Sequence, residues 1–92
     1  MLNYKIFETN EFLKRIEKVA DREKSFIEKK LLQYIYPQLR DEPHYGNNIK
    51  KLVNYKPETW RYRIGKYRLF YLIDEREKTI FILSIDLRKD AY

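Results

Sequence analysis

The chain has 92 residues, of which 43% are hydrophobic and 37% charged, and its formal net charge is +6. This length suits one domain over residues 1–92, with a single core close to the smallest that folds unaided. Without cysteine, the chain has no disulfide framework, no thiolate metal site and no cysteine nucleophile. The sequence shows neither a signal peptide nor an apolar run long enough to cross a bilayer, so we expect a cytoplasmic protein without a membrane partner.

The first part of the chain predicts a strand followed by a helix. Tyr4–Phe7 is a short run of residues that favour strands. Thr9 or Asn10 then offers an N-cap, and apolar side chains recur at helical spacing over residues 10–20. This segment therefore predicts an amphipathic helix with one face for the core.

A second helix is predicted directly after the first. Asp21 is a candidate cap, and the apolar face consists of Ile27, Leu31, Tyr34 and Ile35. Pro37 limits how far this helix can run undisturbed, because proline lacks the amide hydrogen that helices use. The short connection predicts that the two helices form an antiparallel hairpin. Neither helix shows a functional site.

The second half of the chain predicts four strands after a loop over residues 40–48. The hydrophobic period changes there from helical spacing to two. The predicted strands are Ile49–Val53, Trp60–Ile64, Tyr67–Asp74 and Thr79–Leu87. Their short connections imply antiparallel pairing. We therefore predict an α+β fold with an N-terminal strand, a two-helix hairpin and a mostly antiparallel four-strand meander, with the helices on one face of the sheet.

Alternation along the strands assigns side chains to the two faces of the predicted sheet. On the last strand, Phe81, Leu83, Ile85 and Leu87 would lie under the helices, and Ile82, Ser84, Asp86 and Arg88 would face away from them. Four guanidinium groups can then converge on the uncovered face, those of Arg61, Arg63, Arg68 and Arg88. Arginine presents a rigid fork of donors that matches phosphate oxygens, so this face predicts an anion site.

The excess positive charge is concentrated in one segment. Residues 49–72 carry seven basic side chains and one acidic side chain, whereas the segments on either side are nearly balanced. A local surplus of this kind favours a polyanionic partner, and the alternative is a well-solvated sheet face. Tyrosines accompany the basic residues, as in surfaces that stack the bases of single-stranded RNA, although some, such as Tyr62, are expected to fill the core. These tyrosines are Tyr45, Tyr55, Tyr62, Tyr71 and Tyr92.

The sequence contains no standard metal or nucleophile motif. His44 is the only histidine, so a histidine pair is excluded, and we expect it to be a loop residue. Gly46 and Gly65 are isolated and form no phosphate-binding glycine loop. We therefore expect no metal and no cofactor.

The segment WRYRIGKYRLFYLID (Trp60–Asp74) and the ending ILSIDLRKDAY (Ile82–Tyr92) resemble the RelE/ParE superfamily of toxins. The resemblance extends over the first strand, the helix hairpin, Gly46 and the Lys50-Lys51-Leu52 entry to the sheet. The R-x-R-x-G-x-Y-R run is its most specific element, and the terminal R-x-x-x-Y supports it.

This resemblance implies a toxin of a type II toxin–antitoxin pair, with an antitoxin protein, the ribosome and mRNA as partners. In the RelE branch, the toxin cuts mRNA in the ribosomal A site without a metal, through attack of a ribose 2′-hydroxyl on the adjacent phosphate. The alternatives are a ParE-like inhibitor of DNA gyrase that cuts nothing, and a noncatalytic RNA-binding protein or decayed toxin. Whether the free toxin is a monomer or a dimer stays open.

The resemblance also implies residue roles. Arg68 would stabilise the phosphate, Arg88 would lie near the leaving group, and Tyr92 would stack on or orient the base. The RNA-binding residues would be Lys50, Arg61, Arg63 and Lys66.

The resemblance leaves the general base unassigned. Arg61 and Arg63 stand where well-known members carry lysines, and arginine is a poor base because it stays protonated. Lys51, or else Lys50, is our hypothesis for the base, since cationic neighbours favour the neutral form of a lysine. Glu58 is a weaker candidate.

Overall fold

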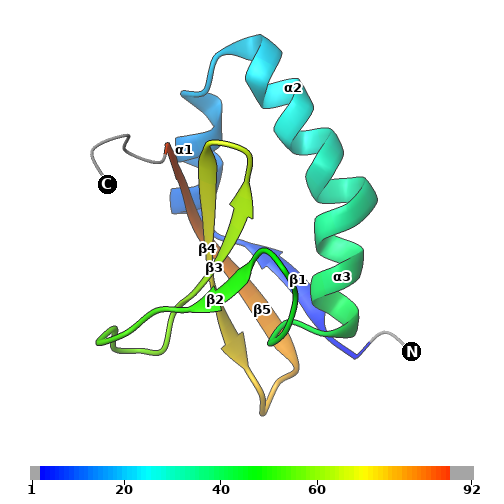
Figure 1. Cartoon of the computed structure of the whole chain (residues 1–92), viewed down its shortest axis with the longest axis vertical. Coiled ribbons are helices and arrows are strands. Elements are labelled where there is room, and N and C mark those ends of the chain that lie inside the picture. Colours follow the sequence, from blue (N-terminus) through cyan, green and yellow to red (C-terminus); the bar gives the residue numbers. More distant parts are fainter. Residues whose placement is uncertain (1–2, 88–92) are drawn as a thin grey trace.

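The computed structural model describes residues 3–87 (Figure 1). The helical elements are α1 (Asn10–Glu17), α2 (Asp21–Lys30), the π-helical turn η1 (Leu31–Ile35) and α3 (Tyr36–Asp41). The strands are β1 (Lys5–Glu8), β2 (Ile49–Lys51), β3 (Trp60–Ile64), β4 (Tyr67–Asp74) and β5 (Thr79–Leu87). Over this part of the chain, no helix has both the length and the apolar character that crossing a membrane requires.

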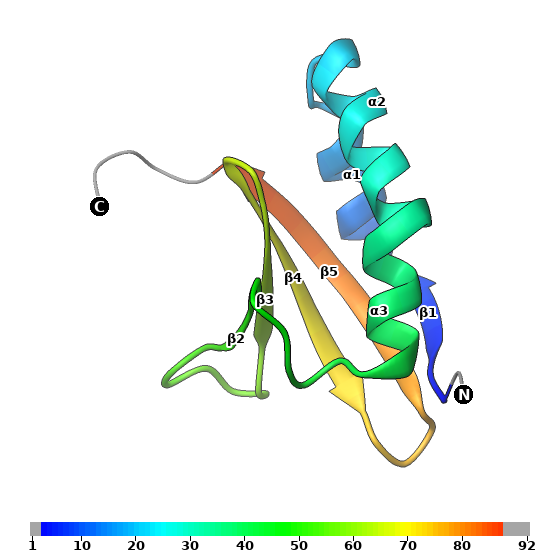
Figure 2. The ribbon, with the colours of Figure 1, turned by 45° about the vertical axis from the view of Figure 1, so that its right-hand side comes forward.

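One five-stranded sheet organises the fold, with the strand order β1-β5-β4-β3-β2. β1 runs parallel to β5, and the other neighbouring strands are antiparallel. The helices lie on one face of this sheet and leave the other face uncovered (Figure 2). The predicted α+β class, with helices on one face of a mostly antiparallel sheet, is confirmed.

Thr9 links the first helix to the last strand. Its side-chain oxygen accepts a hydrogen bond from the amide of Phe12 at 3.2 Å, which caps α1. The same hydroxyl donates to the carbonyl of Ile82 at 2.7 Å. Thr9 therefore fixes the start of α1 against β5.

The second helix continues through Pro37, further than the sequence suggested. The amide of Tyr36 donates to the carbonyl of Leu31, five residues earlier, so the helix widens into η1 just before the proline. Pro37 then lies in the first turn of α3, where a missing amide hydrogen is tolerated. The helical path thus runs from Asp21 to Asp41 with altered hydrogen bonding before the proline.

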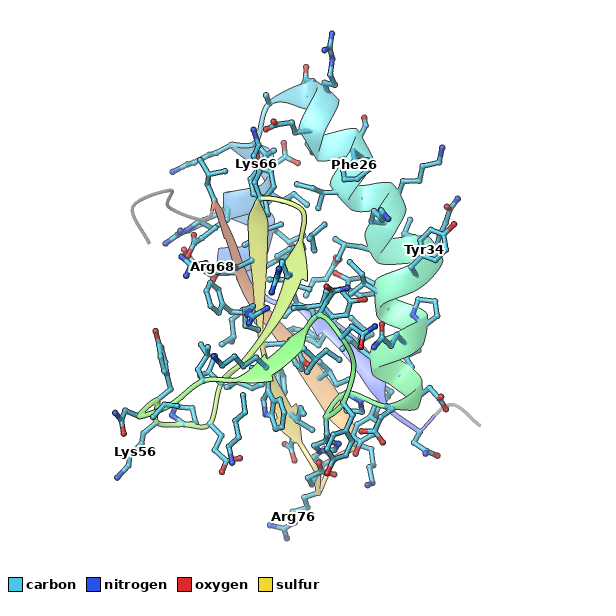
Figure 3. All side chains as sticks on the ribbon, viewed as in Figure 1. Phe26, Tyr34, Lys56, Lys66, Arg68 and Arg76 are labelled. Carbon is cyan, nitrogen blue, oxygen red and sulfur yellow. The ribbon has the colours of Figure 1, made fainter. Side chains whose placement is uncertain are left out.

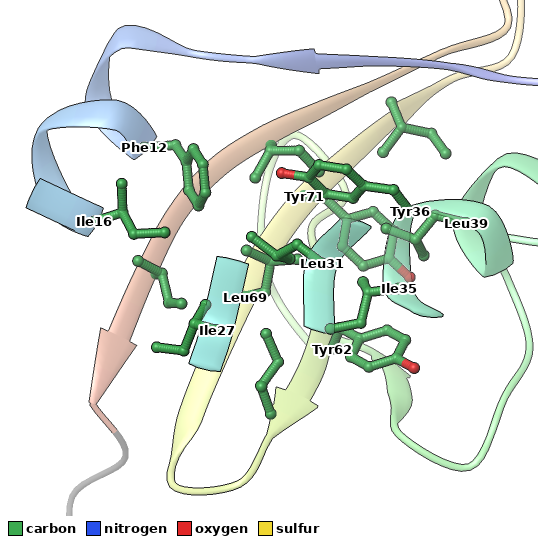
Figure 4. Close-up of a cluster of buried hydrophobic side chains, with 14 of the residues drawn as sticks. Phe12, Ile16, Ile27, Leu31, Ile35, Tyr36, Leu39, Tyr62, Leu69 and Tyr71 are labelled. Carbon is green, nitrogen blue, oxygen red and sulfur yellow. The ribbon is translucent and has the colours of Figure 1, made fainter. Parts of the chain in front are cut away.

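The hydrophobic core lies between the helices and the covered face of the sheet (Figure 4). Side chains from all the helical elements meet those of β3, β4 and β5 there. Its most deeply buried members are Phe12, Ile27, Leu39, Leu69, Tyr71, Ile80 and Ile82. Tyr62 is buried as predicted, and its hydroxyl donates to Gln38 Oε1 at 2.7 Å.

A β-bulge corrects the predicted faces of the last strand. Phe70 pairs with Ser84, but the next residue, Tyr71, pairs with Ile82, so Leu83 is an extra residue on β5. Ile82 is therefore fully buried, whereas the prediction placed it on the uncovered face. Phe81, expected under the helices, instead packs edge-on against the exposed ring of Phe7, with the ring centroids 5.6 Å apart.

Candidate functional site

Three of the four predicted arginines share the uncovered face of the sheet. On β3, Arg61 and Arg63 alternate with the buried Tyr62 and Ile64. On β4, Arg68 precedes the buried Leu69. The fourth arginine, Arg88, lies outside the described residues.

These arginines line a pocket of about 230 Å³ on this face, which we call the arginine pocket. Lys50 of β2 joins them because it pairs in register with Arg61. No acidic side chain lines the pocket within residues 3–87. The lining residues are Lys50, Leu52, Tyr55, Arg61, Arg63, Arg68 and Phe70. The chemistry of this set suits an anion with an apolar or aromatic part.

The backbone and a ring hold the guanidinium groups in place. The Nη1 of Arg61 donates to the carbonyl of Asn48 at 3.3 Å. The Cζ of Arg68 lies 5.5 Å from the centre of the Phe70 ring, and its Nε is buried. A phosphate group entering the pocket would therefore meet donors whose positions are already restricted, which favours binding.

A carboxylate lies at the border of the arginine pocket. Arg68 pairs in register with Asp86 of β5 on one side and with Arg63 on the other. The Asp86 carboxylate accepts a hydrogen bond from Nη1 of Arg15 on α1. Because Asp86 is shared with Arg15, it offsets only part of the positive charge around Arg68.

Three pocket residues, Leu52, Tyr55 and Phe70, were given no site role, although Tyr55 was among the tyrosines predicted to accompany the basic residues. Tyr55 lies on the loop between β2 and β3 and is 54% exposed. The amide of Leu52 donates to the carbonyl of Thr59 at 2.9 Å and closes the base of this loop. The alternation of Arg68 and Phe70 on β4 was the one sequence signal for Phe70, whereas only the loop conformation brings Tyr55 to the pocket.

Two predicted lysines lie elsewhere. Lys51 pairs in register with Trp60, and its Nζ is 3.0 Å from Glu58 Oε2, so the structure does not bring it into the pocket lining. Lys66 lies on the tight turn between β3 and β4, with its Nζ 2.8 Å from Glu23 Oε2 on α2. Of the candidate bases Lys51, Lys50 and Glu58, Lys50 is the one that lines the pocket.

His44 ties the loop after α3 to the turn between β4 and β5. Its Nδ1 is 2.8 Å from Glu42 Oε2, and its Nε2 is 2.6 Å from Glu75 Oε2. The amide of His44 lowers the pKa of Glu42, and the hydroxyl of Tyr4 lowers the pKa of Glu75, with smaller contributions from the imidazole. These contacts give His44 a structural role at the end of the sheet.

The described part of the chain contains no group of three or more histidine, aspartate or glutamate side chains that could hold a metal ion. Cations rather than carboxylates line the pocket. Tyr92, predicted to contact a base, lies outside the described residues, as Arg88 does.

A family model described as the ParE toxin of type II toxin–antitoxin system, parDE, matches residues 7–92. The chain belongs to this toxin family. The match includes all the pocket residues and every strand and helix except the first two residues of β1. No curated protein sequence matches the chain.

Solved structures of RelE toxins share the fold of this ParE-family toxin. In the RelBE2 toxin–antitoxin complex of Mycobacterium tuberculosis, the matched chain is 26% identical with a TM-score of 0.71, and the match covers 95% of this toxin and 100% of that chain. In the archaeal RelE–RelB complex of Pyrococcus horikoshii, the matched chain is 22% identical with a TM-score of 0.70, and the match covers 97% of this toxin and 99% of that chain. The isolated Escherichia coli RelE toxin is 20% identical with a TM-score of 0.67, and the match covers 94% of this toxin and 85% of that chain.

Proposed function

We propose that this toxin is a metal-independent endoribonuclease that cuts mRNA on the ribosome and so arrests translation. The observation that carries the proposal is the pocket of four cations on the uncovered sheet face, without an acidic side chain in its described lining. Phosphodiester cleavage develops negative charge on the phosphate, and preorganised cationic donors stabilise such charge. The fold shared with RelE toxins supports the same activity.

The reaction that fits the pocket is transfer of the phosphate within the RNA. The ribose 2′-oxygen attacks the adjacent phosphorus, and the bond to the 5′-oxygen of the next nucleotide breaks. The products are a 2′,3′-cyclic phosphate and a 5′-hydroxyl. Arg68, held against Phe70, would contact the phosphate oxygens, with Arg61 and Arg63 on the neighbouring strand.

Two proton transfers complete this reaction, one from the 2′-hydroxyl and one to the departing 5′-oxygen. Lys50 lines the pocket, so we assign the proton acceptor to Lys50 in preference to Lys51, whose ammonium pairs with Glu58. Arg88 is assigned to the leaving group by its place in the terminal motif. Tyr55 offers a ring for a base beside the phosphate, in addition to the stacking role proposed for Tyr92.

The proposal includes a cognate antitoxin protein as partner. The structures from M. tuberculosis, P. horikoshii and E. coli include complexes of a RelE toxin with its antitoxin. An antitoxin for this toxin would have acidic side chains to complement the cationic pocket, because opposite charges speed and orient association. Antitoxin binding and RNA binding would then compete.

Inhibition of DNA gyrase is a second candidate function. The matching family model is that of the ParE toxin, and ParE-like toxins are the gyrase-directed branch of the superfamily. The position of Asp86 beside Arg68 also favours this candidate, since a carboxylate next to the phosphate site weakens its electrostatic attraction for RNA.

Cleavage by the purified toxin tests the proposal. Ribosomes programmed with a defined mRNA are incubated with the toxin, and the ends of the fragments are characterised. The proposal expects fragments with 5′-hydroxyl ends on ribosome-bound mRNA. Intact mRNA, together with inhibition of purified gyrase, would instead favour the second candidate.

A further inference from the structure

A stripe of two aromatic rings and a lysine runs along an exposed side of α2 and η1. We call Phe26, Lys30 and Tyr34 the aromatic stripe; both of its rings are labelled in Figure 3. Phe26 is 53% exposed, and Tyr34 is 62% exposed although the sequence pattern placed it on the apolar face of this helix. The Lys30 Nζ lies 5.7 Å from the centre of the Phe26 ring and 5.3 Å from that of Tyr34. The ammonium is thus held between two exposed rings.

The aromatic stripe forms one wall of a groove between the helix and the sheet. The groove has a volume of about 320 Å³, and its opposite wall includes Asn48 and Arg63. A second hollow of about 350 Å³ adjoins it at Phe26 and continues past Arg22 and Lys66. In this second hollow, Glu23 is paired with Lys66 and with the hydroxyl of Tyr67, so its negative charge is already neutralised in part.

Arg63 connects the groove to the arginine pocket, because it contributes to the lining of both. A ligand whose phosphate lies in the arginine pocket could therefore continue past Arg63 toward Tyr34 and Phe26. Phe26 and Tyr34 are eight residues apart on a helical path, about 12 Å along the axis, so an extended strand would contact them in succession.

We propose that the aromatic stripe is a second binding surface for single-stranded RNA, continuous with the arginine pocket through Arg63. This inference rests on the proposed function, since it assigns the path of the RNA on either side of the cleavage site. Exposed rings interleaved with cations match the alternation of bases and phosphates in a single strand. Lys30 would pair with a phosphate while the rings on either side stack on bases.

The same geometry argues against an acidic amphipathic peptide as the ligand. A helical peptide docks through contiguous apolar anchors in an apolar groove. Here Lys30 interrupts the apolar surface between Phe26 and Tyr34, and Arg63 and Asn48 place polar groups beside Ile64 on the opposite wall. A positive charge between two rings suits a ligand in which negative phosphates alternate with bases, as they do in a single RNA strand.

Binding of a fluorescent single-stranded RNA of roughly 16 nucleotides, about the longest site of one small binding domain, tests the inference by anisotropy. The variants are Phe26→Ser and Tyr34→Ser, made singly and together. Stacking on one ring accounts for roughly five- to 150-fold in affinity, so each variant should bind at least about fivefold more weakly. Leu32→Ser is the matched control, since Leu32 is 69% exposed on the same helix but lines a different pocket.

Unchanged RNA affinity in the Phe26 and Tyr34 variants would overturn the inference. Loss of antitoxin capture by these variants, with RNA affinity kept, would also overturn it and assign the surface to a protein. Failure of the proposed function is separate, because it is read from mRNA cleavage and from Arg68→Ala. If the toxin cleaves no mRNA but its Phe26 and Tyr34 variants bind RNA more weakly, the stripe is still an RNA-binding surface and the ribonuclease proposal fails.

Discussion

Arg63 of β3 and Arg68 of β4 are directly opposed across the antiparallel pair, on the face of the sheet that no helix covers. Like charges in directly opposed positions destabilise a sheet. The fold accepts this arrangement beside Lys50 and Arg61, so the four cations form a surface whose electrostatic energy improves when an anion binds.

Arg63→Gln should stabilise the free toxin. Removing one of two opposed charges relieves repulsion, and we expect the free energy of unfolding to rise by about 0.2 to 1 kcal/mol. Urea unfolding at low ionic strength measures this change. Arg76→Gln, on the exposed turn between β4 and β5, is the control for loss of one positive charge and should change stability less. A lower stability of Arg63→Gln than of Arg76→Gln would contradict the account.

RNA binding should weaken steeply with salt. Each phosphate contact to a single strand adds about −0.7 to the slope of log affinity against log salt concentration. Arg63→Gln should therefore reduce the magnitude of the slope by about 0.7, whereas Arg76→Gln should leave it unchanged. Titrations of one oligonucleotide at several salt concentrations provide the slopes. A wild-type affinity independent of salt would remove the electrostatic basis of the pocket.

Lys50→Ala and Lys51→Ala should differ in activity. Lys50 lines the pocket, whereas Lys51 is paired with Glu58 and lies 6.0 Å from the Trp60 ring. We expect Lys50→Ala to lose mRNA cleavage by roughly two to four orders of magnitude, the usual effect of removing a proton-transfer group. Lys51→Ala should keep most of its activity and its ribosome binding. Loss of cleavage in Lys51→Ala, with cleavage kept in Lys50→Ala, would identify Lys51 as the proton acceptor.

Stability should fall in acid because of the two carboxylates that contact His44. Hydrogen bonds from Tyr4 to Glu75 and from the amide of His44 to Glu42 lower both carboxyl pKa values below their ordinary 4.5. The folded state therefore binds fewer protons than the unfolded state, so this stabilisation is complete above about pH 4.5 and is lost as pH falls through the lowered pKa values. Urea unfolding across this range should show a weaker pH dependence for Glu75→Gln. An unchanged pH dependence in Glu75→Gln would contradict this contribution of Glu75.

Tyr71→Phe should destabilise the fold. Tyr71 is fully buried, and its hydroxyl donates to the carbonyl of Pro43 at 2.7 Å. Without this donor the buried carbonyl loses its partner, which costs about 1 to 3 kcal/mol. Thermal or urea unfolding measures the loss, and Tyr45→Phe, at a side chain that is 77% exposed, is the control. Equal stability of the two variants would show that the Pro43 contact contributes little.

The sequence was most informative where strict alternation sets both a strand and its faces. The bounds of Trp60–Ile64, Tyr67–Asp74 and Thr79–Leu87 agree with the predicted strands. The grouping of Arg61 and Arg63 on one face follows from the same period of two.

The sequence failed where one residue changes a local geometry. The extra residue Leu83 shifts the faces of β5 without disturbing the apolar pattern, because residues 80–83 are all hydrophobic. A π-helical turn accommodates Pro37, and the spacing of the apolar residues does not predict this turn. Tyr55 reaches the pocket through the fold of a loop, and loop conformation depends on contacts that hydrophobic patterns do not record.

The most direct test of the ribonuclease activity is to map mRNA 5′ ends in cells after brief induction of the toxin, with Arg68→Ala as the matched variant. We expect new 5′-hydroxyl ends within translated regions for the wild type, and none for a folded Arg68→Ala variant. Arrested growth with intact mRNA and broken DNA would contradict it, as would cleavage that persists in Arg68→Ala.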